Sequence, residues 1–276
     1  MPATYTPIRY PGGKTRLHSL VKSLIETNRL EGDTYVEPFA GGAGLACKLL
    51  LLEEVPSIIL NDYDRAVYCM WDSIVNDSSD LCEFVQSAPL NIEFWLIQRD
   101  IYRNRDTAEA KELGFASFYL NRTNVSGILN GGVIGGIGQT GKYKIDCRFN
   151  RDNLQKKILR IGEKRDQIEL YNLDAEVFVE SVLMDRDSVF CYLDPPYVQK
   201  GPGLYRSSFN EGKHRSLASL IQSCKFPWMA TYDCDDLIDE LYGDNIECTY
   251  DIAYSAYQSS IGKEKLILPK HVKYIE

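Results

Sequence analysis

A strand-like run that ends in an acid, two prolines and an aromatic residue carries the clearest chemistry in this sequence. The run is Val189-Phe-Cys-Tyr-Leu193, and Asp194, Pro195, Pro196 and Tyr197 follow it directly. In an open α/β sheet, the carboxyl end of a buried strand borders the ligand crevice. Two prolines fix an extended path without N–H donors, so the aspartate carboxylate and the first proline carbonyl are both acceptors. The tyrosine can stack on a planar ring.

Two acceptors beside an aromatic face suit an exocyclic amine on a heteroaromatic ring. Such an amine is a poor nucleophile because its lone pair is delocalised into the ring. If Asp194 and the Pro195 carbonyl hold its two hydrogens, electron density can shift onto nitrogen and the lone pair can turn toward an electrophile. The alternative is a proline-rich turn without chemistry, and the glycine-rich turn upstream weighs against it.

That glycine-rich turn joins a short apolar strand to a helical pattern. It reads Thr34-Tyr-Val-Glu-Pro-Phe-Ala-Gly-Gly-Ala-Gly44, and the next apolar run, Ile58-Ile-Leu60, ends in Asn61-Asp62. Glycines here let a ligand approach the backbone, and an acid about 20 residues later can accept hydrogen bonds from ribose hydroxyls. Asp62 lies 21 residues after Gly41. The glycine order is not GxGxxG, so nicotinamide binding is disfavoured, while an ordinary turn followed by an exposed acid remains open.

A second glycine-rich segment, Tyr10-Pro-Gly-Gly-Lys-Thr15, has part of the pattern of a phosphate loop. That motif requires a further glycine five positions before Gly13, where this chain has Ile8. A nucleotide triphosphatase is therefore disfavoured. A turn that leads Lys14 into a site remains open.

Length and composition set outer limits. The chain has 276 residues, 44% hydrophobic and 25% charged, which excludes collagen, coiled coil and disorder. It contains no run of about 18 uncharged apolar residues, and its first residues lack a signal-peptide core, so we expect a cytoplasmic protein without a membrane span. Eight cysteines without a CxxC pair and three histidines predict buried free thiols rather than zinc ligands or disulfides.

Charge is unevenly distributed along the chain, although the net charge is −8. Nine lysines and arginines face three acids between Lys142 and Arg165, whereas residues 226–262 contain no basic residue. A basic strip can be a footprint of nucleic acid. It can equally be the solvated face of an amphipathic helix, because four apolar residues recur near helical spacing at Leu154, Ile158, Leu159 and Ile161.

Apolar runs alternate with helical patterns, which predicts a mostly parallel α/β sheet covered on both faces. The expected strands are 34–36, 58–60, 168–171, 189–193, 228–231, 247–254 and 266–268. The expected helices between them include 15–30, 44–52 and 215–223. From Asp64 to about Arg151 the chain is poor in strands, with helical patterns at 66–75, 92–104 and 109–120 and six glycines between Gly131 and Gly141. We interpret this stretch as a helical insertion.

Together these motifs, in this order, resemble the Dam-like adenine-specific DNA methyltransferases. The resemblance is carried by Tyr10-Pro-Gly-Gly-Lys14, Glu37-Pro-Phe-Ala-Gly-Gly42, Asn61-Asp62, Phe118-Tyr-Leu-Asn-Arg-Thr123, Asp194-Pro-Pro-Tyr197 and Gly262-Lys-Glu-Lys-Leu-Ile-Leu268. It implies a Rossmann-like methyltransferase fold with an inserted, mainly helical target-recognition domain. The implied boundaries are 1–64 and 152–276 for the catalytic domain and 65–151 for the insert.

The resemblance also implies the ligands and the residues that meet them. S-adenosyl-L-methionine is the implied cofactor, without a metal, and the residues expected around it are Tyr10, Gly12, Gly13, Lys14, Phe39, Gly41, Asp62 and Asp174. A flipped adenine is expected at Asp194, Pro195, Pro196 and Tyr197. Double-stranded DNA is the implied partner, met by Asn121, Arg122, Asn124, Lys142, Lys144 and Arg148, and a cognate restriction endonuclease is a second candidate partner.

The predicted function is therefore methyl transfer to the N6 amine of a flipped adenine in a specific DNA sequence. The same chemistry on cytosine N4 or on an RNA amine is the alternative enzymatic interpretation. A non-catalytic regulator that binds cofactor or DNA is the third, but such a protein has no need of amine-polarising acceptors at Asp194. The recognised bases and the oligomeric state do not follow from the sequence.

Overall fold

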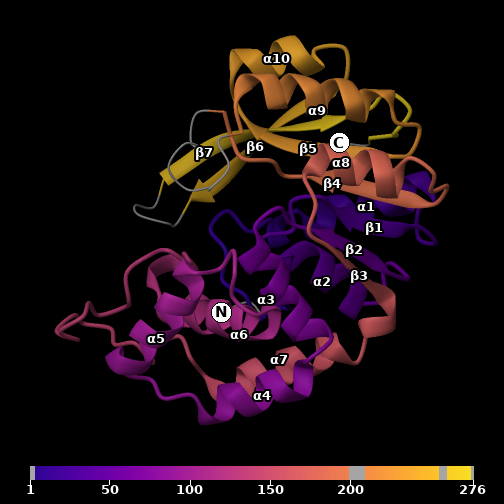
Figure 1. Cartoon of the computed structure of the whole chain (residues 1–276). Coiled ribbons are helices and arrows are strands. Elements are labelled where there is room, and N and C mark those ends of the chain that lie inside the picture. The colour runs from indigo at the N-terminus through magenta and orange to yellow at the C-terminus, as the bar shows by residue number, and fades with distance from the viewer. Residues whose placement is uncertain (1–3, 199–208, 255–259, 275–276) are drawn as a thin grey trace.

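Seven strands form one sheet in the computed structural model, which describes residues 4–198, 209–254 and 260–274. Their spatial order is β3-β2-β1-β4-β5-β7-β6, and β7 runs antiparallel to both of its neighbours while the five strands before it are parallel (Figure 1). The strands are Thr34–Glu37 (β1), Ile58–Asn61 (β2), Ile168–Tyr171 (β3), Val189–Leu193 (β4), Trp228–Asp233 (β5), Ile246–Tyr254 (β6) and Ser260–Leu268 (β7). This topology confirms the predicted Rossmann-like methyltransferase fold.

Helices cover both faces of the sheet. Successive residues of a strand point to opposite faces, so each strand contributes to both hydrophobic clusters. On β1, Tyr35 joins the hydrophobic cluster of one face and Val36 the cluster of the other. The first face carries η1 (Thr15–Leu17), α1 (His18–Asn28), α2 (Gly44–Leu51) and α7 (Arg151–Gly162). The second face carries α8 (Ala175–Phe178), the π-helical η4 (Val179–Leu183), α9 (Glu211–Ser223) and α10 (Asp236–Tyr242), and η3 (Arg165–Gln167) precedes β3.

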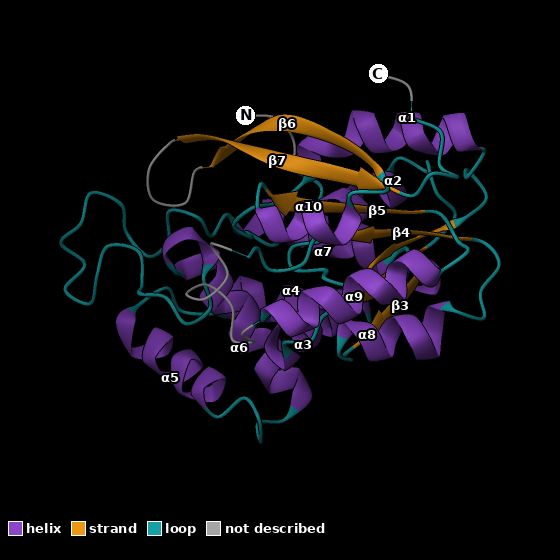
Figure 2. Cartoon of the chain, turned by 90° about the horizontal axis from the view of Figure 1, so that it is seen from above, coloured by secondary structure: helices purple, strands orange, loops and turns teal. Residues whose placement is uncertain are grey.

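The segment between β2 and α7 is helical, as predicted. It contains α3 (Arg65–Val75), α4 (Ser78–Ser87), α5 (Ile92–Arg103), α6 (Ala110–Thr123) and the short η2 (Val125–Gly127), followed by turns up to residue 150. Side chains of Asp64, Asn91 and Glu109 cap α3, α5 and α6 at their N-termini. Figure 2 shows α5 at the end of the molecule away from the sheet.

The insert and the sheet share one hydrophobic cluster. Trp95, Tyr119 and Phe149 of the insert belong to the same cluster as the buried residues of α1 and α2. Arg151, at the start of α7, donates to the backbone oxygens of Gln86 and Ala88 at 3.0 and 2.8 Å. The predicted boundaries at residues 64 and 151 therefore do not separate two hydrophobic cores. They remain predictions about which residues recognise the target.

The expected strands are all present, with ends shifted by at most a few residues except at β7, which begins at Ser260. Three helices escaped the sequence reasoning: α4, α8 and α10. α8 and α10 are only 4 and 7 residues long, and α4 begins with two serines, which have low helix propensity.

Most of the cysteines lie in the interior of the protein. Five cysteines are buried free thiols as expected, but Cys147 and Cys234 are exposed, so the expectation was wrong for these two. Among the described residues no helix has the length and hydropathy needed to cross a membrane. The same residues contain no group of three potential histidine, cysteine or carboxylate ligands placed to hold a metal ion.

Candidate active site

The carboxyl ends of β1, β2 and β4 bring three sequence motifs to one edge of the sheet. β1 pairs with β2 on one side and with β4 on the other, so the Glu37 turn, Asp62 and Asp194 follow adjacent parallel strands. From β1 the chain adds β2 and β3 on one side of the sheet, and it then returns to add β4 and β5 on the other side of β1. The strand order therefore reverses between β1 and β4. Ligands of open α/β sheets bind at such a switch point.

Asp194 is held by a lysine from the far end of the sequence. Lys14 Nζ lies 2.6 Å from Asp194 Oδ1 and 2.8 Å from Oδ2, and the lysine is only 6% exposed. Thr231 Oγ1, at the end of β5, donates to Asp194 Oδ1 at 2.9 Å. The predicted amine acceptor is therefore a carboxylate that a buried ammonium and a hydroxyl fix in place.

Tyr197 belongs to the same hydrogen-bonded group. Its hydroxyl accepts a hydrogen bond from Lys14 Nζ at 2.7 Å and donates to Glu264 on β7. Glu264 is fully buried and also accepts from the hydroxyl of Tyr250 on β6. Lys14 Nζ is 3.8 Å from Glu264 Oε2, so one ammonium lies between two carboxylates.

Burial and charge act in opposite directions on this group. Burial raises the pKa of Asp194, while the Lys14 ammonium and its hydrogen bonds lower it. Burial, together with Asp194 and Glu264, raises the pKa of Tyr197 far above its ordinary value. The tyrosine hydroxyl therefore keeps its proton at neutral pH and remains a donor to Glu264.

The glycine turn after β1 is shaped by the packing of Tyr10. Gly41 has φ +45°, and a Cβ there would lie 2.7 Å from Tyr10 Cε1. A Cβ on Gly42 would approach Tyr10 Cβ equally closely, at 2.7 Å. The Gly41 carbonyl also accepts from the Trp71 indole at 2.9 Å. The close packing of Tyr10 is therefore one physical reason for glycine at both positions.

Asp62 lies beside this turn with both oxygens hydrogen-bonded to the backbone. Oδ2 accepts from Gly41 N and Oδ1 from Asp64 N, each at 2.9 Å. Burial raises the pKa of Asp62 to about 7, and the two backbone N–H groups oppose that shift. The residues around the carboxylate are mainly apolar and aromatic, and they leave no room for a water molecule between them: Ala40, Leu60, Asn61, Tyr68, Trp71, Leu170 and Tyr171.

The other expected cofactor residues lie around the same edge. Phe39 is half-buried, and its ring meets that of Phe209 edge-on at 5.8 Å. Gly12 has φ +79°, a left-handed conformation that favours glycine, and it and Gly13 precede Lys14 in an exposed turn. Asp174 caps α8 by accepting from Glu176 N at 3.0 Å.

Asp174 has a second contact besides its helix cap. Its Oδ2 lies 2.7 Å from Lys213 Nζ, and the resulting ion pair contributes to a lowered pKa of Asp174 even though its partial burial, the largest effect, raises it. The residue is therefore a helix cap and ion-pair partner in this structure, and its expected role toward the cofactor remains a prediction.

Two residues expected to contact DNA are buried in the insert. Asn121 is 1% exposed, accepts from Arg9 N at 2.9 Å and donates to the carbonyls of Arg9 and Gly127 at 2.7 and 3.0 Å. Asn124 is fully buried, and its amide oxygen accepts from the Trp95 indole at 2.7 Å. In this structure both amides hold backbone and core groups in place, so neither presents a surface to DNA.

Arg122 is also largely enclosed. Its guanidinium donates to Pro7 O at 3.1 Å and through Nε to Arg148 O at 2.9 Å. Burial and the neighbouring charges of Arg9 and Arg148 lower its pKa to about 9. Arg122 thus remains a cation at neutral pH in a group of like charges, which favours a nearby anion.

The remaining expected DNA residues are exposed. Lys142, Lys144 and Arg148 all lie in the turns that follow the glycine-rich loop. In the rest of the basic strip, Arg151 binds backbone oxygens next to α4 and Lys164 pairs with Glu53 at 3.1 Å, whereas Lys156 and Arg160 are exposed on α7. The exposed cations of the strip before α7 are therefore Lys142, Lys144 and Arg148.

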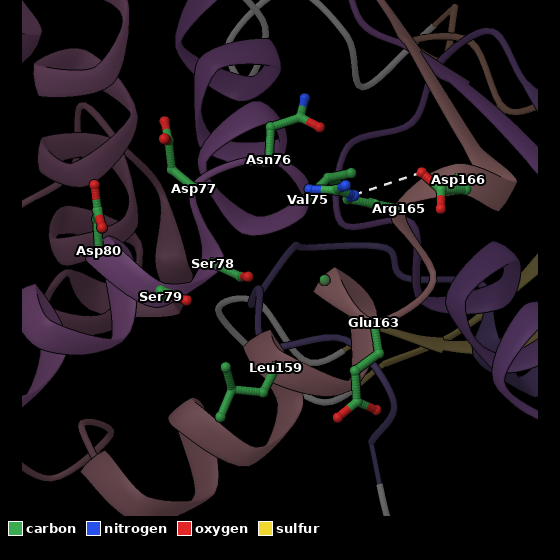
Figure 3. Close-up of a pocket in the computed structure, with 11 residues that line it drawn as sticks. Val75, Asn76, Asp77, Ser78, Ser79, Asp80, Leu159, Glu163, Arg165 and Asp166 are labelled. Atoms are coloured by element: carbon green, nitrogen blue, oxygen red, sulfur yellow. Dashed lines mark ion pairs between the residues drawn. The ribbon is translucent and has the colours of Figure 1, made fainter.

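A surface pocket between α4 and α7 lies apart from this group (Figure 3). Its lining includes the acids Asp77, Asp80, Glu163 and Asp166, and Arg165 pairs with Asp166 there at 3.4 Å. None of the residues expected at the active site lines it. Its acidic lining is unsuited to a nucleic-acid backbone.

Sequence reasoning missed the contribution of β5, β6 and β7 to the site. Thr231, Tyr250 and Glu264 complete the polar group around Asp194. The sequence signal for Glu264 was an acid between two lysines just before an apolar strand end. The structure shows that this acid is fully buried, which is unusual for a glutamate. The sequence offered nothing comparable for the threonine.

The fold and the site together define a class of protein, namely Rossmann-like methyltransferases with an Asp-Pro-Pro-Tyr segment at the end of β4. Residues 10–261 match the family model of the D12 class N6 adenine-specific DNA methyltransferases. The chain belongs to this family, which confirms the predicted resemblance. It is an adenine-specific DNA methyltransferase that uses an S-adenosylmethionine-type methyl donor.

Two relatives of the chain are type II methyltransferases by name. The chain is 24% identical over 203 residues to the type II methyltransferase M.MjaIII of Methanocaldococcus jannaschii, covering 69% of this chain and 68% of that protein. It is also 24% identical over 256 residues to the type II methyltransferase M.CviBI of Paramecium bursaria Chlorella virus NC1A, covering 90% of each.

Proposed function

We propose that Asp194, Pro195, Pro196 and Tyr197 hold the target adenine after it has left the DNA stack. The observation that carries this proposal is the Asp194 carboxylate, fixed at the end of β4 by Lys14 and Thr231. Asp194 and the Pro195 carbonyl would accept the two N6 hydrogens, and the Tyr197 ring would stack on the base, a contact worth about 1–3 kcal/mol. Acceptors that are fixed before the reaction stabilise the developing charge without reorganisation.

We infer that S-adenosyl-L-methionine binds at the edge of the sheet beside Asp62. The residues there offer apolar and aromatic surface for a purine ring and a carboxylate for ribose hydroxyls. Because a carboxylate can accept about four hydrogen bonds, Asp62 can hold a ribose as well as the N–H groups of Gly41 and Asp64. The cofactor supplies an electrophilic methyl group on a positively charged sulfur.

We propose that DNA lies across the insert and the Asp194 edge of the sheet. Lys142, Lys144 and Arg148 supply exposed cations, and the partly enclosed Arg122 adds a fourth. Residues 65–151 would then form the target-recognition part of the enzyme. Asn121 and Asn124 would support this surface from inside rather than touch the bases.

The test is incubation of the purified protein with methyl-labelled S-adenosylmethionine and, separately, unmethylated plasmid DNA or RNA. Digestion to nucleosides identifies the labelled base. We expect label in DNA as N6-methyladenine, and sequencing of the modified plasmid then maps the recognised site. Label in N4-methylcytosine or in RNA would instead support the alternative substrates.

We also propose a partner endonuclease, because both named relatives are type II methyltransferases. Modified plasmid should resist a restriction enzyme that cuts at the mapped site, whereas unmodified plasmid should be cut. A plasmid that is cut equally before and after full modification would remove this proposal without affecting the adenine chemistry.

A further inference from the structure

In the arrangement that the structure shows, the Asp194 carboxylate is already largely occupied. Lys14 Nζ lies within hydrogen-bond distance of both oxygens, at 2.6 and 2.8 Å, and Oδ1 also accepts from Thr231. An N6 amine that donates to this carboxylate has to approach the same oxygens. About three of the four acceptor sites of the carboxylate are taken, and the Lys14 ammonium neutralises the charge that would polarise the amine. Withdrawal of Lys14 from at least one oxygen would therefore strengthen the contact between Asp194 and the amine.

The buried Lys14 ammonium has few alternative anionic partners among the described residues. Lys14 is 6% exposed, and moving its charge away from every anion inside the protein would be costly. Glu264 is fully buried, and its Oε2 lies 3.8 Å from Lys14 Nζ. A shift on the order of 1 Å would bring the ammonium to hydrogen-bond distance from that oxygen.

Glu264 is well fixed for this task. Tyr197 donates to one of its oxygens and Tyr250 to the other. On the sheet, Glu264 of β7 pairs with Asp233 of β5, two residues beyond Thr231. The carboxylate is therefore held in position by two hydroxyls and the backbone register, while the lysine side chain remains the flexible member of the pair.

We propose that Glu264 is a positioning residue that takes over the Lys14 ammonium and so releases Asp194 for the substrate amine. This inference rests on the proposed role of Asp194 as the amine acceptor. Before the base enters, Lys14 neutralises Asp194. When the base is bound, Lys14 pairs with Glu264 and Asp194 accepts the N6 hydrogens.

The experiment measures how strongly the enzyme prefers a target base that has an amine. Dissociation constants are measured, with S-adenosylhomocysteine present, for two duplexes of the mapped site. One carries adenine at the target and the other carries purine, which lacks the exocyclic amine. The ratio of the purine constant to the adenine constant reports the amine contact, and comparing variants cancels differences in base pairing between the duplexes.

The proposal predicts that Glu264→Gln lowers this ratio about tenfold, because Lys14 then remains on Asp194. In a Lys14→Met background, where no ammonium has to move, the same substitution should change the ratio by less than about twofold. A ratio that Glu264→Gln leaves unchanged would overturn the proposal. An equal fall in both backgrounds would also overturn it, because Glu264 would then act only by supporting Tyr197.

Two further variants keep the test decisive. If Glu264→Gln does not fold, Glu264→Asp takes its place, since a shorter carboxylate lengthens the path for Lys14 and should lower the ratio only while the lysine is present. Glu240→Gln removes an exposed carboxylate that pairs with Arg215 and should leave the ratio unchanged. Thermal unfolding and S-adenosylhomocysteine affinity verify that each variant is folded.

The Asp194→Asn variant separates a wrong role for Glu264 from a wrong adenine site, because the same ratio is measured for it. If Asp194→Asn also leaves the ratio at the wild-type value, Asp194 does not bind the amine and the proposed site is wrong. If Asp194→Asn abolishes the preference while Glu264→Gln does not, the adenine site stands and only the role of Glu264 is refuted.

Discussion

The strand-end group around Asp194 and the exposed basic turns of the insert use charge in opposite ways. Lys14 and Glu264 are almost completely buried and hydrogen-bonded at fixed distances. Lys142 and Lys144 lie in solvent-exposed turns. Charges in a buried group are weakly screened by salt, whereas exposed charges are strongly screened. We therefore expect methyl transfer to depend mainly on the geometry of the buried group, and DNA affinity to depend on ionic strength.

Asn121 of α6 and its C-cap Asn124 link the two regions. They lie in the insert, yet they behave like the strand-end group, because Asn121 links Arg9 of the N-terminal segment to Gly127. The N-terminal segment in turn leads to Lys14. Part of the insert therefore supports the edge of the sheet that carries Asp194.

The largest effect is expected from loss of the Tyr197 ring. Tyr197→Ala removes base stacking and one hydrogen-bond partner each from Lys14 and Glu264, so single-turnover methyl transfer should fall by roughly a hundredfold or more. Tyr197→Phe keeps the ring and loses only the hydroxyl, so its rate should fall by about tenfold. Equal losses in both variants would mean that the hydroxyl, and not stacking, is what matters.

Asp62 should decide cofactor affinity. Asp62→Asn should weaken S-adenosylmethionine binding roughly ten- to a hundredfold in calorimetry, because a charged acceptor of ribose hydroxyls is lost. The matched control is Asp64→Asn, since asparagine caps a helix as well as aspartate does. Unchanged affinity in folded Asp62→Asn would contradict the cofactor role.

The raised pKa of Asp62 adds a pH test. Its pKa is about 7, so the carboxylate is the main form above this pH and the neutral acid below it. Cofactor affinity of the wild type should therefore fall as the pH decreases through about 7, and Asp62→Asn should lack this dependence. The same pH dependence in both proteins would assign it to another group.

Asn121 tests whether the buried asparagines support the fold. Asn121→Leu removes three hydrogen bonds inside the protein, so the free energy of unfolding should fall by about 2–4 kcal/mol in urea titrations. Asn153→Leu, at an exposed position of α7, is the control and should change it by less than about 0.5 kcal/mol. Unchanged stability together with weaker DNA binding would instead restore Asn121 as a DNA contact.

The smallest effect is expected at the exposed turns. Each phosphate contact contributes roughly −0.9 to the slope of log affinity against log salt, so Lys142→Glu with Lys144→Glu should flatten the slope by about 1.8. Lys225→Glu, in the exposed turn just before β5, is the control and should leave the slope unchanged. A salt slope that survives the double substitution would place DNA elsewhere.

Much of the fold could be predicted because its signals are local. The run before Asp194 is continuous and apolar, as buried parallel strands are, and the glycines after β1 mark a strand-to-helix turn. The family resemblance then supplied the order of the motifs. The same reasoning brought Asp62 and Asp194 to one edge of the sheet, where the structure places them.

The rest of the site depends on contacts between distant residues. Lys14 and Asp194 are 180 residues apart, and Tyr197 and Glu264 are 67 residues apart, so no local pattern links them. Asn121 and Asn124 have the composition of a recognition loop, and only their burial reveals that their hydrogen bonds are internal. The insert's place in the shared hydrophobic cluster was equally invisible from spacing.

The most direct test of the account is the single-turnover rate of Asp194→Asn on DNA that carries the mapped site. Asparagine preserves the shape of the side chain but loses the charge that holds Lys14 and polarises the amine. Thermal unfolding and cofactor affinity should stay close to wild type, and the rate should fall by about a hundred- to a thousandfold. A folded, cofactor-binding Asp194→Asn that transfers methyl at the wild-type rate would contradict the central claim.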